Sequence, residues 1–272
     1  MSINDNPVKK AAEILGTFYT VVFSPYDIYL IKGDPAGRRK LIDALLSQVS
    51  PAYLAALQNY RTILKQKNFV LKEHTANEVL LDSYNQQMAR YGAAIITKRF
   101  ELIETLNESA RKIYNLFSRT KNNLMIYYDS FISEEPGLCE KNCEKGFLAL
   151  LETKKSIERK RAISLVGPHL DDVAIQLNDK SARSFASEGQ KRAIALSLRL
   201  AEYYEVKKVF GEPPVILMDD VFGELDREKK AALDSVIDPD AQLFFTCTDD
   251  HIVSSLVKNA QRFSIRDGSI FQ

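Results

Sequence analysis

The stretch Pro214-Val215-Ile216-Leu217-Met218-Asp219-Asp220 leads four apolar residues directly into two adjacent carboxylates. A short apolar run bounded by proline is typical of a buried parallel strand. Carboxylates at the C-terminal end of such a strand lie in the crevice where α/β sheets bind ligands. Two neighbouring acids are costly there unless a cation faces them, and Mg²⁺ with phosphate is the usual partner. The stretch predicts a Walker B strand of an α/β nucleotide-binding fold, against the alternative of a polar strand end that enters a loop.

A second motif, Ser187-Glu188-Gly189-Gln190, precedes residues 191–200, whose apolar spacing predicts a helix. The N-terminus of a helix binds anions through its free N–H groups, and glycine lets a phosphate approach the backbone. Followed by the acidic stretch and then by Gly223-Glu224-Leu225-Asp226, the motif resembles the S-x-G-Q signature of ABC-type ATPases. In that class the signature contacts the γ-phosphate of ATP bound to the opposite subunit, and the last stretch is the D-loop.

The phosphate loop of such ATPases, G-x-x-x-x-G-K-[ST], does not occur in this sequence. Its N–H groups and lysine normally supply the main contacts to the β- and γ-phosphates. Residues 33–40 include glycines and basic residues, but Pro35 and the spacing are unsuited to a phosphate cradle. We expect the chain alone to be a poor ATPase, and the sequence leaves open whether it acts as an enzyme.

Further blocks extend the resemblance to one family. They are residues 21–27 (VVFSPYD), 31–43, 46–53 and 167–172 (GPHLDD), in addition to the two ATPase motifs. Together they resemble RecF, a family of bacterial recombination-repair ATPases related to the SMC proteins. The Phe-Ser-Pro and Gly-Pro-His blocks lie outside the general ATPase motifs, so they favour RecF over another SMC-like or nuclease-associated ATPase.

The resemblance runs from end to end of the chain, and the part that RecF proteins carry before the first block is missing, the phosphate loop included. A truncated product, a split gene and a late start codon are all compatible with this pattern. Two positions depart from the family: Leu170 stands where an Arg is usual, and Gly223 stands where Ser is common. Asp220 replaces the Glu of the wider ABC class, but RecF-like proteins tolerate Asp at this position.

The fold implied by the resemblance is α/β: an ABC-type ATPase head, incomplete without its phosphate-loop part, with an inserted α-helical, coiled-coil-like lobe. Residues 1–33 are the predicted remnant of the head, and 34–162 are the helical lobe, known as lobe II. Residues 163–272 are the C-terminal part of the head, which carries the signature motif, Walker B and the D-loop.

Local patterns predict the elements within these parts. Asp34 and Ser50 each precede a proline, which predicts helix N-caps. Thr75 and Glu78 have the spacing of a capping box, which opens a predicted helix of some forty residues and about 60 Å. This helix forms an antiparallel hairpin with the preceding one, whose apolar seam Lys67 interrupts. Another helix is predicted near residues 140–161, and strands at 18–31, 123–132, 174–177, 215–219, 242–246 and on both sides of Asp267-Gly268.

Roles for the acidic residues follow from the resemblance. Asp219 would orient Mg²⁺ through its water shell, and Asp220 would act as general base for the attacking water. Asp226 would link the two sites of a dimer. At the position of the ABC switch histidine, Thr248 or Asp249 is the predicted switch residue.

The resemblance also implies cofactors and partners: ATP with Mg²⁺, an ATP-dependent homodimer, DNA, and the proteins RecO and RecR. Ser187, Gly189 and Gln190 would contact the ATP of the other subunit. The closed dimer would clamp single-stranded DNA gaps or their junctions with duplex and help RecO and RecR load recombinase. Two alternatives stay open: a non-hydrolysing fragment that binds DNA or a partner protein, and another SMC-like ATPase.

Composition sets limits on these functions. The net charge is +1, from 37 basic and 36 acidic residues, so the chain has no overall charge for tight autonomous DNA binding. Two basic clusters, Arg38-Arg39-Lys40 and Arg159-Lys160-Arg161, are predicted to line a DNA clamp, unless they are solvated helix faces. No apolar stretch approaches the about 20 residues of a membrane span, and three cysteines fit a reducing compartment. We expect a cytoplasmic protein without a membrane partner.

Overall fold

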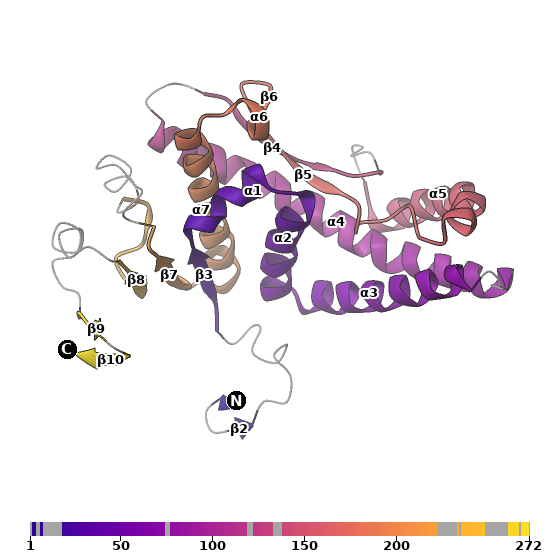
Figure 1. Cartoon of the computed structure of the whole chain (residues 1–272), viewed down its shortest axis with the longest axis horizontal. Coiled ribbons are helices and arrows are strands. Elements are labelled where there is room, and N and C mark those ends of the chain that lie inside the picture. Colours follow the sequence, from indigo (N-terminus) through magenta and orange to yellow (C-terminus); the bar gives the residue numbers. More distant parts are fainter. Residues whose placement is uncertain are drawn as a thin grey trace.

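The structure is a computed structural model of the chain (Figure 1), and it describes residues 2–3, 6–7, 18–73, 77–118, 122–132, 138–221, 233, 235–247, 261–266 and 268–271. A small parallel sheet lies at one end and a group of long helices at the other. Between them run a second sheet and the helix that carries the predicted signature motif. Buried apolar side chains from all these parts form one hydrophobic cluster.

The parallel sheet has the order β3-β7-β8, formed by Thr20–Phe23, Val215–Asp219 and Leu243–Thr246. Strand β7 is central and confirms the strand predicted from the acidic stretch. Its inward side chains Ile216 and Met218 are buried. The prediction that β8 is a buried core strand is wrong. Its residues alternate between half-buried and exposed, and the ring of Phe244 is exposed.

The strand predicted over residues 18–31 is only partly correct. It ends at Phe23, and a 3-10 helix η2 (Pro25–Ile28) and a short helix α1 (Tyr29–Lys32) follow. Ser24 and Asp27 form a capping box around η2: the Ser24 N–H donates to Asp27 Oδ2 at 2.8 Å, and the Ser24 hydroxyl oxygen accepts from the N–H of Tyr26. A cap followed by proline starts a helix, and this local signal outweighs the β-branched composition.

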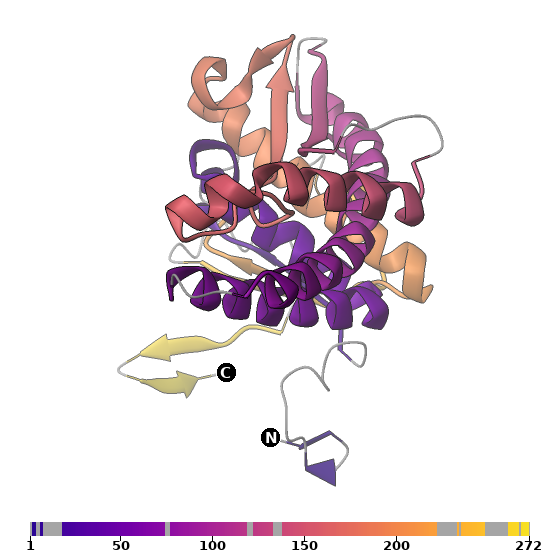
Figure 2. The ribbon, with the colours of Figure 1, turned by 90° about the vertical axis from the view of Figure 1, so that its right-hand side faces the viewer.

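Four helices form the long end of the molecule: α2 (Pro35–Val49), α3 (Pro51–Lys72), α4 (Glu78–Phe117) and α5 (Glu140–Arg161). Helix α4 has the predicted forty residues, and α5 has the predicted bounds. Figure 2 views the molecule from this end, with α3 and α5 in front. Where α4 meets α5, a Cβ on Gly92 would lie 2.3 Å from the ring of Phe147, so glycine permits the close approach of the two helices.

The predicted capping box at the start of α4 is wrong. The helix begins at Glu78, and its N-cap is Asn77, whose side chain accepts from the N–H of Val79 at 2.9 Å. Thr75 lies outside the described residues. The predictions for α2 and α3 hold better: Asp34 and Ser50 are their N-caps, although only Ser50 accepts a hydrogen bond from the first turn.

The second sheet is antiparallel, with the order β4-β5-β6, and packs on α4. Its strands are Leu124–Asp129, Asp172–Leu177 and Lys180–Ser181. The chain continues through a short helix α6 (Ala182–Phe185) into α7 (Glu188–Phe210), which contacts both α4 and β3. Helix α7 thus joins the helical end to the parallel sheet.

Two hairpins complete the described chain: β1 (Ser2–Ile3) with β2 (Asn6–Pro7), and β9 (Ser264–Arg266) with β10 (Ser269–Phe271). The second confirms the hairpin predicted around Asp267-Gly268. None of the helices in the described ranges has the length and apolar character needed to cross a membrane.

Candidate functional site

The two predicted catalytic carboxylates lie at the carboxyl end of β7. Asp219 is the last residue of the strand, and its Oδ1 accepts a hydrogen bond from the Thr246 hydroxyl of β8 at 2.6 Å. The N–H of Asp220 donates to the carbonyl oxygen of Thr246 at 3.2 Å. Both aspartates are exposed, and in the part of the chain that the structure describes neither forms an ion pair. Two solvent-facing carboxylates without a cation are hard oxygen ligands suited to Mg²⁺.

The backbone at this strand end is unusual. Asp220 has φ of 49°, in the left-handed region, which costs energy for a residue with a Cβ but is tolerated by aspartate better than by most residues. Such conformations are concentrated at functional sites. Here the change of direction turns Asp220 out of the strand immediately after Asp219.

The predicted signature residues form the N-terminus of α7. Ser187 is its N-cap and makes a complete capping box with Gln190. The Ser187 N–H donates to Gln190 Oε1 at 2.8 Å, and the Gln190 N–H donates to Ser187 Oγ at 3.3 Å. The helix end is exposed to solvent. The exposed N-terminus of a helix, a position at which anions can bind, therefore lies where the sequence predicts it, and each of the two side chains accepts from the backbone N–H of the other residue.

Gly189 has no role in the packing of this helix. A Cβ built on it would meet no atom within 4 Å, so a larger residue fits and would favour the helix, because glycine is a poor helix former. Glycine at this place suits a ligand or a partner that approaches the backbone closely. Beside it, Lys32 Nζ contacts Glu188 Oε2 at 2.5 Å, and this hydrogen bond lowers the pKa of Glu188.

The Phe-Ser-Pro block holds α7 against the parallel sheet. Arg199 of α7 donates from Nε and Nη2 to Asp27 Oδ1 at 3.0 and 2.7 Å, and Asp27 is in turn part of the η2 capping box. The Nη1 of Arg199 donates to Glu202 Oε2 at 2.8 Å. Burial raises the pKa of Glu202, while Arg199 opposes this effect. Asp27 therefore positions the signature helix, a role that the spacing of the sequence did not show.

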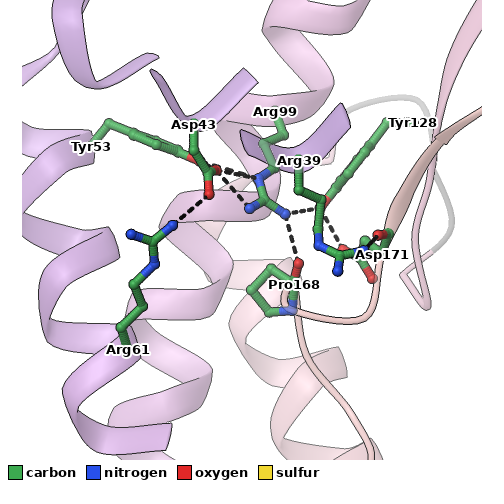
Figure 3. Close-up of polar contacts among 8 residues, drawn as sticks. All are labelled: Arg39, Asp43, Tyr53, Arg61, Arg99, Tyr128, Pro168 and Asp171. Carbon is green, nitrogen blue, oxygen red and sulfur yellow. Dashed lines mark hydrogen bonds and ion pairs between the residues drawn. The ribbon is translucent and has the colours of Figure 1, made fainter. Parts of the chain in front are cut away.

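The Gly-Pro-His block forms a second anchor, in the helical end (Figure 3). Its centre is Arg99 of α4, which is 2% exposed. Arg99 Nη1 donates to the Pro168 carbonyl oxygen at 2.7 Å and to the Tyr128 hydroxyl at 3.0 Å. Its Nη2 donates to Asp43 Oδ1 at 2.7 Å. One guanidinium thereby joins α2, α4, β4 and the block.

The two aspartates of this block also accept hydrogen bonds from other side chains of the protein. Asp171 Oδ2 accepts from the hydroxyls of Tyr128 and Ser130, and burial raises the pKa of Asp171. Asp172 binds Arg38 of α2 through two hydrogen bonds of 2.8 Å. Arg38 Nη1 also donates to the carbonyl oxygens of two residues in or just after α1, Leu30 at 3.1 Å and Gly33 at 3.0 Å.

His169 and Gly167 complete the anchor. The Tyr60 hydroxyl of α3 lies 2.7 Å from His169 Nδ1, and burial lowers the pKa of His169 to about 4, so the ring is neutral at pH 7. Gly167 has φ of 142°, and a Cβ there would lie 2.1 Å from the Tyr60 hydroxyl. Only glycine fits this position.

These contacts correct one predicted DNA contact. Arg38 is buried and its donors bind protein oxygens, so its role is structural and it is not placed to meet a phosphate. Arg39 is half-buried and donates to the Asp171 carbonyl oxygen, whereas Lys40 is exposed.

The second predicted cluster, at the end of α5, is more open. Lys160 and Arg161 are exposed, and Arg159 is half-buried with Nη1 3.4 Å from Glu78 Oε1. The predicted D-loop residue Asp226 and the predicted switch residues Thr248 and Asp249 lie outside the described residues.

Sequence reasoning missed the anchoring residues, although two signals were present. Arg99 occupies a position within the apolar stripe of the long helix, and Lys67 interrupts the seam of α3. Lys67 Nζ lies 2.6 Å from Glu158 Oε2 of α5, with both side chains 1% exposed. A charged residue on a buried helical face needs a buried partner, and both residues have one.

Curated relatives match almost the whole length of the chain. The chain is 34% identical over 273 residues to the DNA replication and repair protein RecF of Symbiobacterium thermophilum, covering 99% of this chain and 73% of the relative. It is 37% identical over 264 residues to the RecF protein of Streptococcus thermophilus, covering 97% and 71%. No protein-family model matches the chain.

Two solved structures have the same fold. One is the recombination mediator protein RecF with ATPrS in the RecFOR pathway, with a TM-score of 0.87 and 33% identity; 99% of this chain and 71% of that chain are covered. The other is the same mediator with ATP, with a TM-score of 0.88 and 32% identity over the same shares. The α/β head with a helical lobe, expected from the sequence, is therefore confirmed.

Proposed function

This chain belongs to the RecF family of DNA replication and repair proteins, and on that premise we propose that it supplies the helical lobe and part of the ATPase head of an ATP-dependent DNA clamp. The observation that carries the proposal is the exposed pair Asp219-Asp220 at the carboxyl end of the central parallel strand. Two acids held apart from protein cations in the described chain are suited to a bound cation and nucleotide.

The residues at this strand end fit Mg²⁺ and ATP. Asp219, oriented by the Thr246 hydroxyl, would hold the water shell of the ion. Asp220, one residue further and turned outward, would accept the proton of a water molecule. When bound, Mg²⁺ neutralises charge on the phosphate oxygens.

The signature residues would act across a homodimer. The open space at Gly189 supports a close approach of a phosphate to the first turn of α7, where Ser187 and Gln190 would bind the γ-phosphate of ATP held by the other subunit. Asp226 as the D-loop residue, and Thr248 or Asp249 as the switch, stay predictions. The division of the chain into head and helical lobe at about residues 33 and 163 also stays a prediction.

The wider role follows from the family. We propose that the clamp binds single-stranded gaps and their junctions with duplex DNA in the cytoplasm and assists RecO and RecR. Lys40, Lys160 and Arg161, which are exposed, are the predicted phosphate contacts that the structure leaves accessible. Arg39 and Arg159 are weaker candidates because they are half-buried.

A second function is supported by the buried contacts that anchor the helices of the helical end. In this alternative the chain binds DNA or a partner protein through its helical end without hydrolysing ATP. The anchored helices provide a rigid surface for that purpose whether or not nucleotide binds.

One experiment separates the two functions. The chain is co-expressed with a phosphate-loop segment from a RecF relative, and its mass in solution is measured with and without ATP. We expect an ATP-dependent dimer that Ser187→Arg abolishes, with hydrolysis that Asp220→Asn stops while the dimer persists. A Ser187→Arg variant that dimerises normally with ATP would rule out the signature assignment. Unchanged mass in all samples, with DNA binding retained, would favour the second function.

A further inference from the structure

The outward face of α3 is basic and has no acidic residue. Over its 22 residues the helix contains no Asp or Glu, and it contains four basic residues. Lys67 is buried in its pair with Glu158, while Arg61, Lys65 and Lys72 are exposed. Arg61 has one partner, Asp43 Oδ2 at 3.1 Å; in the described chain Lys65 and Lys72 form no ion pair.

A groove of about 460 Å³ runs along this face. It is lined by Arg61, Leu64, Lys65, Asn68, Phe69 and Lys72. Phe69 is 64% exposed, so its ring contributes little to the core. Residues three and four apart share a helix face, and therefore Lys65 and Lys72 lie on either side of the Phe69 ring.

The groove adjoins the predicted cluster at the end of α5. Asn68 Oδ1 accepts from the N–H of Ser164 at 2.7 Å, three residues after Arg161. The buried pair between Lys67 and Glu158 holds the same parts of the two helices together. Figure 1 shows α3 and α5 at the same end of the molecule. The exposed Lys160 and Arg161 stand four and three residues before Ser164 in the chain.

We propose that this groove binds single-stranded DNA, with one base stacked on Phe69 and the flanking phosphates on Lys65 and Lys72. Cations alone would suit any polyanion, but an exposed aromatic ring between cations is the arrangement that binds unpaired bases. The bases of a duplex are stacked on one another and cannot cover the ring. The inference rests on the proposed function and adds a site for the single strand.

The absence of tryptophan from the chain provides a direct test. In Phe69→Trp the new indole is the only one in the protein, and a stacked thymine should quench its emission. The probe is a 20-nucleotide oligothymidine at low salt, without ATP. Phe185→Trp is the matched control, because Phe185 is 69% exposed and lies 5.5 Å from a lysine, Lys180, but on α6. We expect saturable quenching of the first variant only.

Affinity measurements on the full chain give a second readout. Phe69→Leu should weaken oligothymidine binding about tenfold and leave binding of a duplex of the same length within about twofold. Lys65→Gln and Lys72→Gln should each reduce the salt slope for the single strand by about 0.7. All three variants change exposed side chains, so their unfolding curves should match that of the parent chain.

The outcomes separate the site from the function. If the parent chain binds oligothymidine but Phe69→Leu binds equally well and Phe69→Trp is not quenched, the groove assignment is wrong and DNA binding resides elsewhere. If polyglutamate quenches Phe69→Trp as strongly as oligothymidine does, the groove is a site for acidic peptides. If the parent chain binds no DNA of either kind without ATP, the groove assignment fails, whereas the ATP-dependent clamp is tested separately by co-expression with the phosphate-loop segment.

Discussion

Two pairs of adjacent aspartates, Asp171-Asp172 and Asp219-Asp220, have opposite surroundings in this molecule. Asp171 is buried among the hydroxyls of Tyr128 and Ser130, and Asp172 holds Arg38 through two hydrogen bonds. Asp219 and Asp220 are exposed at a strand end, and their hydrogen bonds in the described chain are to Thr246. The same dipeptide therefore stabilises the fold in one place and is available to a ligand in the other.

The two pairs differ in whether a substitution would leave a buried polar group without a hydrogen-bond partner. Removing a partner from the first pair leaves a buried charge without compensation, which is strongly destabilising. Removing a carboxylate at the second pair leaves only solvent-facing groups, so the fold should tolerate the change. Stability measurements can test this contrast independently of any assay of function.

The largest effect is expected at the centre of the buried network. Arg99→Met removes the guanidinium that satisfies Asp43, the Pro168 carbonyl and Tyr128, and the free energy of unfolding should fall by about 3–5 kcal/mol. Urea unfolding followed by circular dichroism measures it. Arg90→Met, an exposed arginine on the same helix, should change stability by less than about 0.5 kcal/mol. Equal effects for both variants would contradict the anchor role.

The next effect depends on pH. Burial lowers the pKa of His169 from 6.5 to about 4, so the unfolded chain takes up this proton more readily than the folded one. The contribution of neutral His169 is complete above pH 6.5 and is lost as the pH falls toward 4, by up to about 3 kcal/mol. Unfolding free energies measured from pH 7 to 4 should decline more steeply for the parent chain than for His169→Gln.

Titration of Asp171 has the opposite effect on the pH dependence of stability. Because burial raises its pKa, protonation on acidification favours the folded state, and the comparison with His169→Gln separates the two groups. Parallel pH profiles for the parent chain and His169→Gln would show that the histidine does not titrate differently in the folded state.

A matched pair of conservative changes compares the two dipeptides directly. Asp172→Asn weakens the charged hydrogen bonds to the buried Arg38 and should cost about 1.5–3 kcal/mol. Asp220→Asn alters an exposed side chain and should cost less than about 0.5 kcal/mol. Thermal and urea unfolding of both variants under one set of conditions would decide. A larger loss for Asp220→Asn would reverse the assignment of structural and ligand-binding roles.

The smallest predicted effect has the opposite sign. Gly189→Ala should raise the free energy of unfolding by a few tenths of a kcal/mol, because the added methyl group meets no atom and alanine favours a helix. The same change should weaken the ATP-dependent dimer that forms when the chain is co-expressed with the phosphate-loop segment. Gly211→Ala is the control: with φ of 77° it should lose about 1 kcal/mol instead.

Periodicity and caps in the sequence predicted the local elements well. The strand β7, the forty-residue helix α4 and the bounds of α5 all follow from local patterns. The errors are also local: the cap at Ser24-Pro25 ended a strand early, and Asn77 capped α4 in place of Thr75.

The long-range contacts had no local signature. The basic neighbours of Arg38 predict a DNA contact, but its partner Asp172 is distant in the sequence and meets it only in the folded chain. The pairing of Arg199 with Asp27 was hidden for the same reason. The resemblance to RecF singled out the Phe-Ser-Pro and Gly-Pro-His blocks without giving a physical reason. The structure supplies it, because residues of both blocks form long-range contacts that hold helices in place.

The capping box of α7 sets a condition on anything that binds there. Ser187 and Gln190 already satisfy each other's N–H groups, so a phosphate that engages them replaces existing hydrogen bonds and adds few new ones. We expect free nucleotide or inorganic phosphate to gain little from this exchange. Only a nucleotide presented by a second subunit, with the rest of an interface closing at the same time, would offset it. The capping box would then disfavour binding of free nucleotide or phosphate and permit binding of nucleotide that is held by a second subunit.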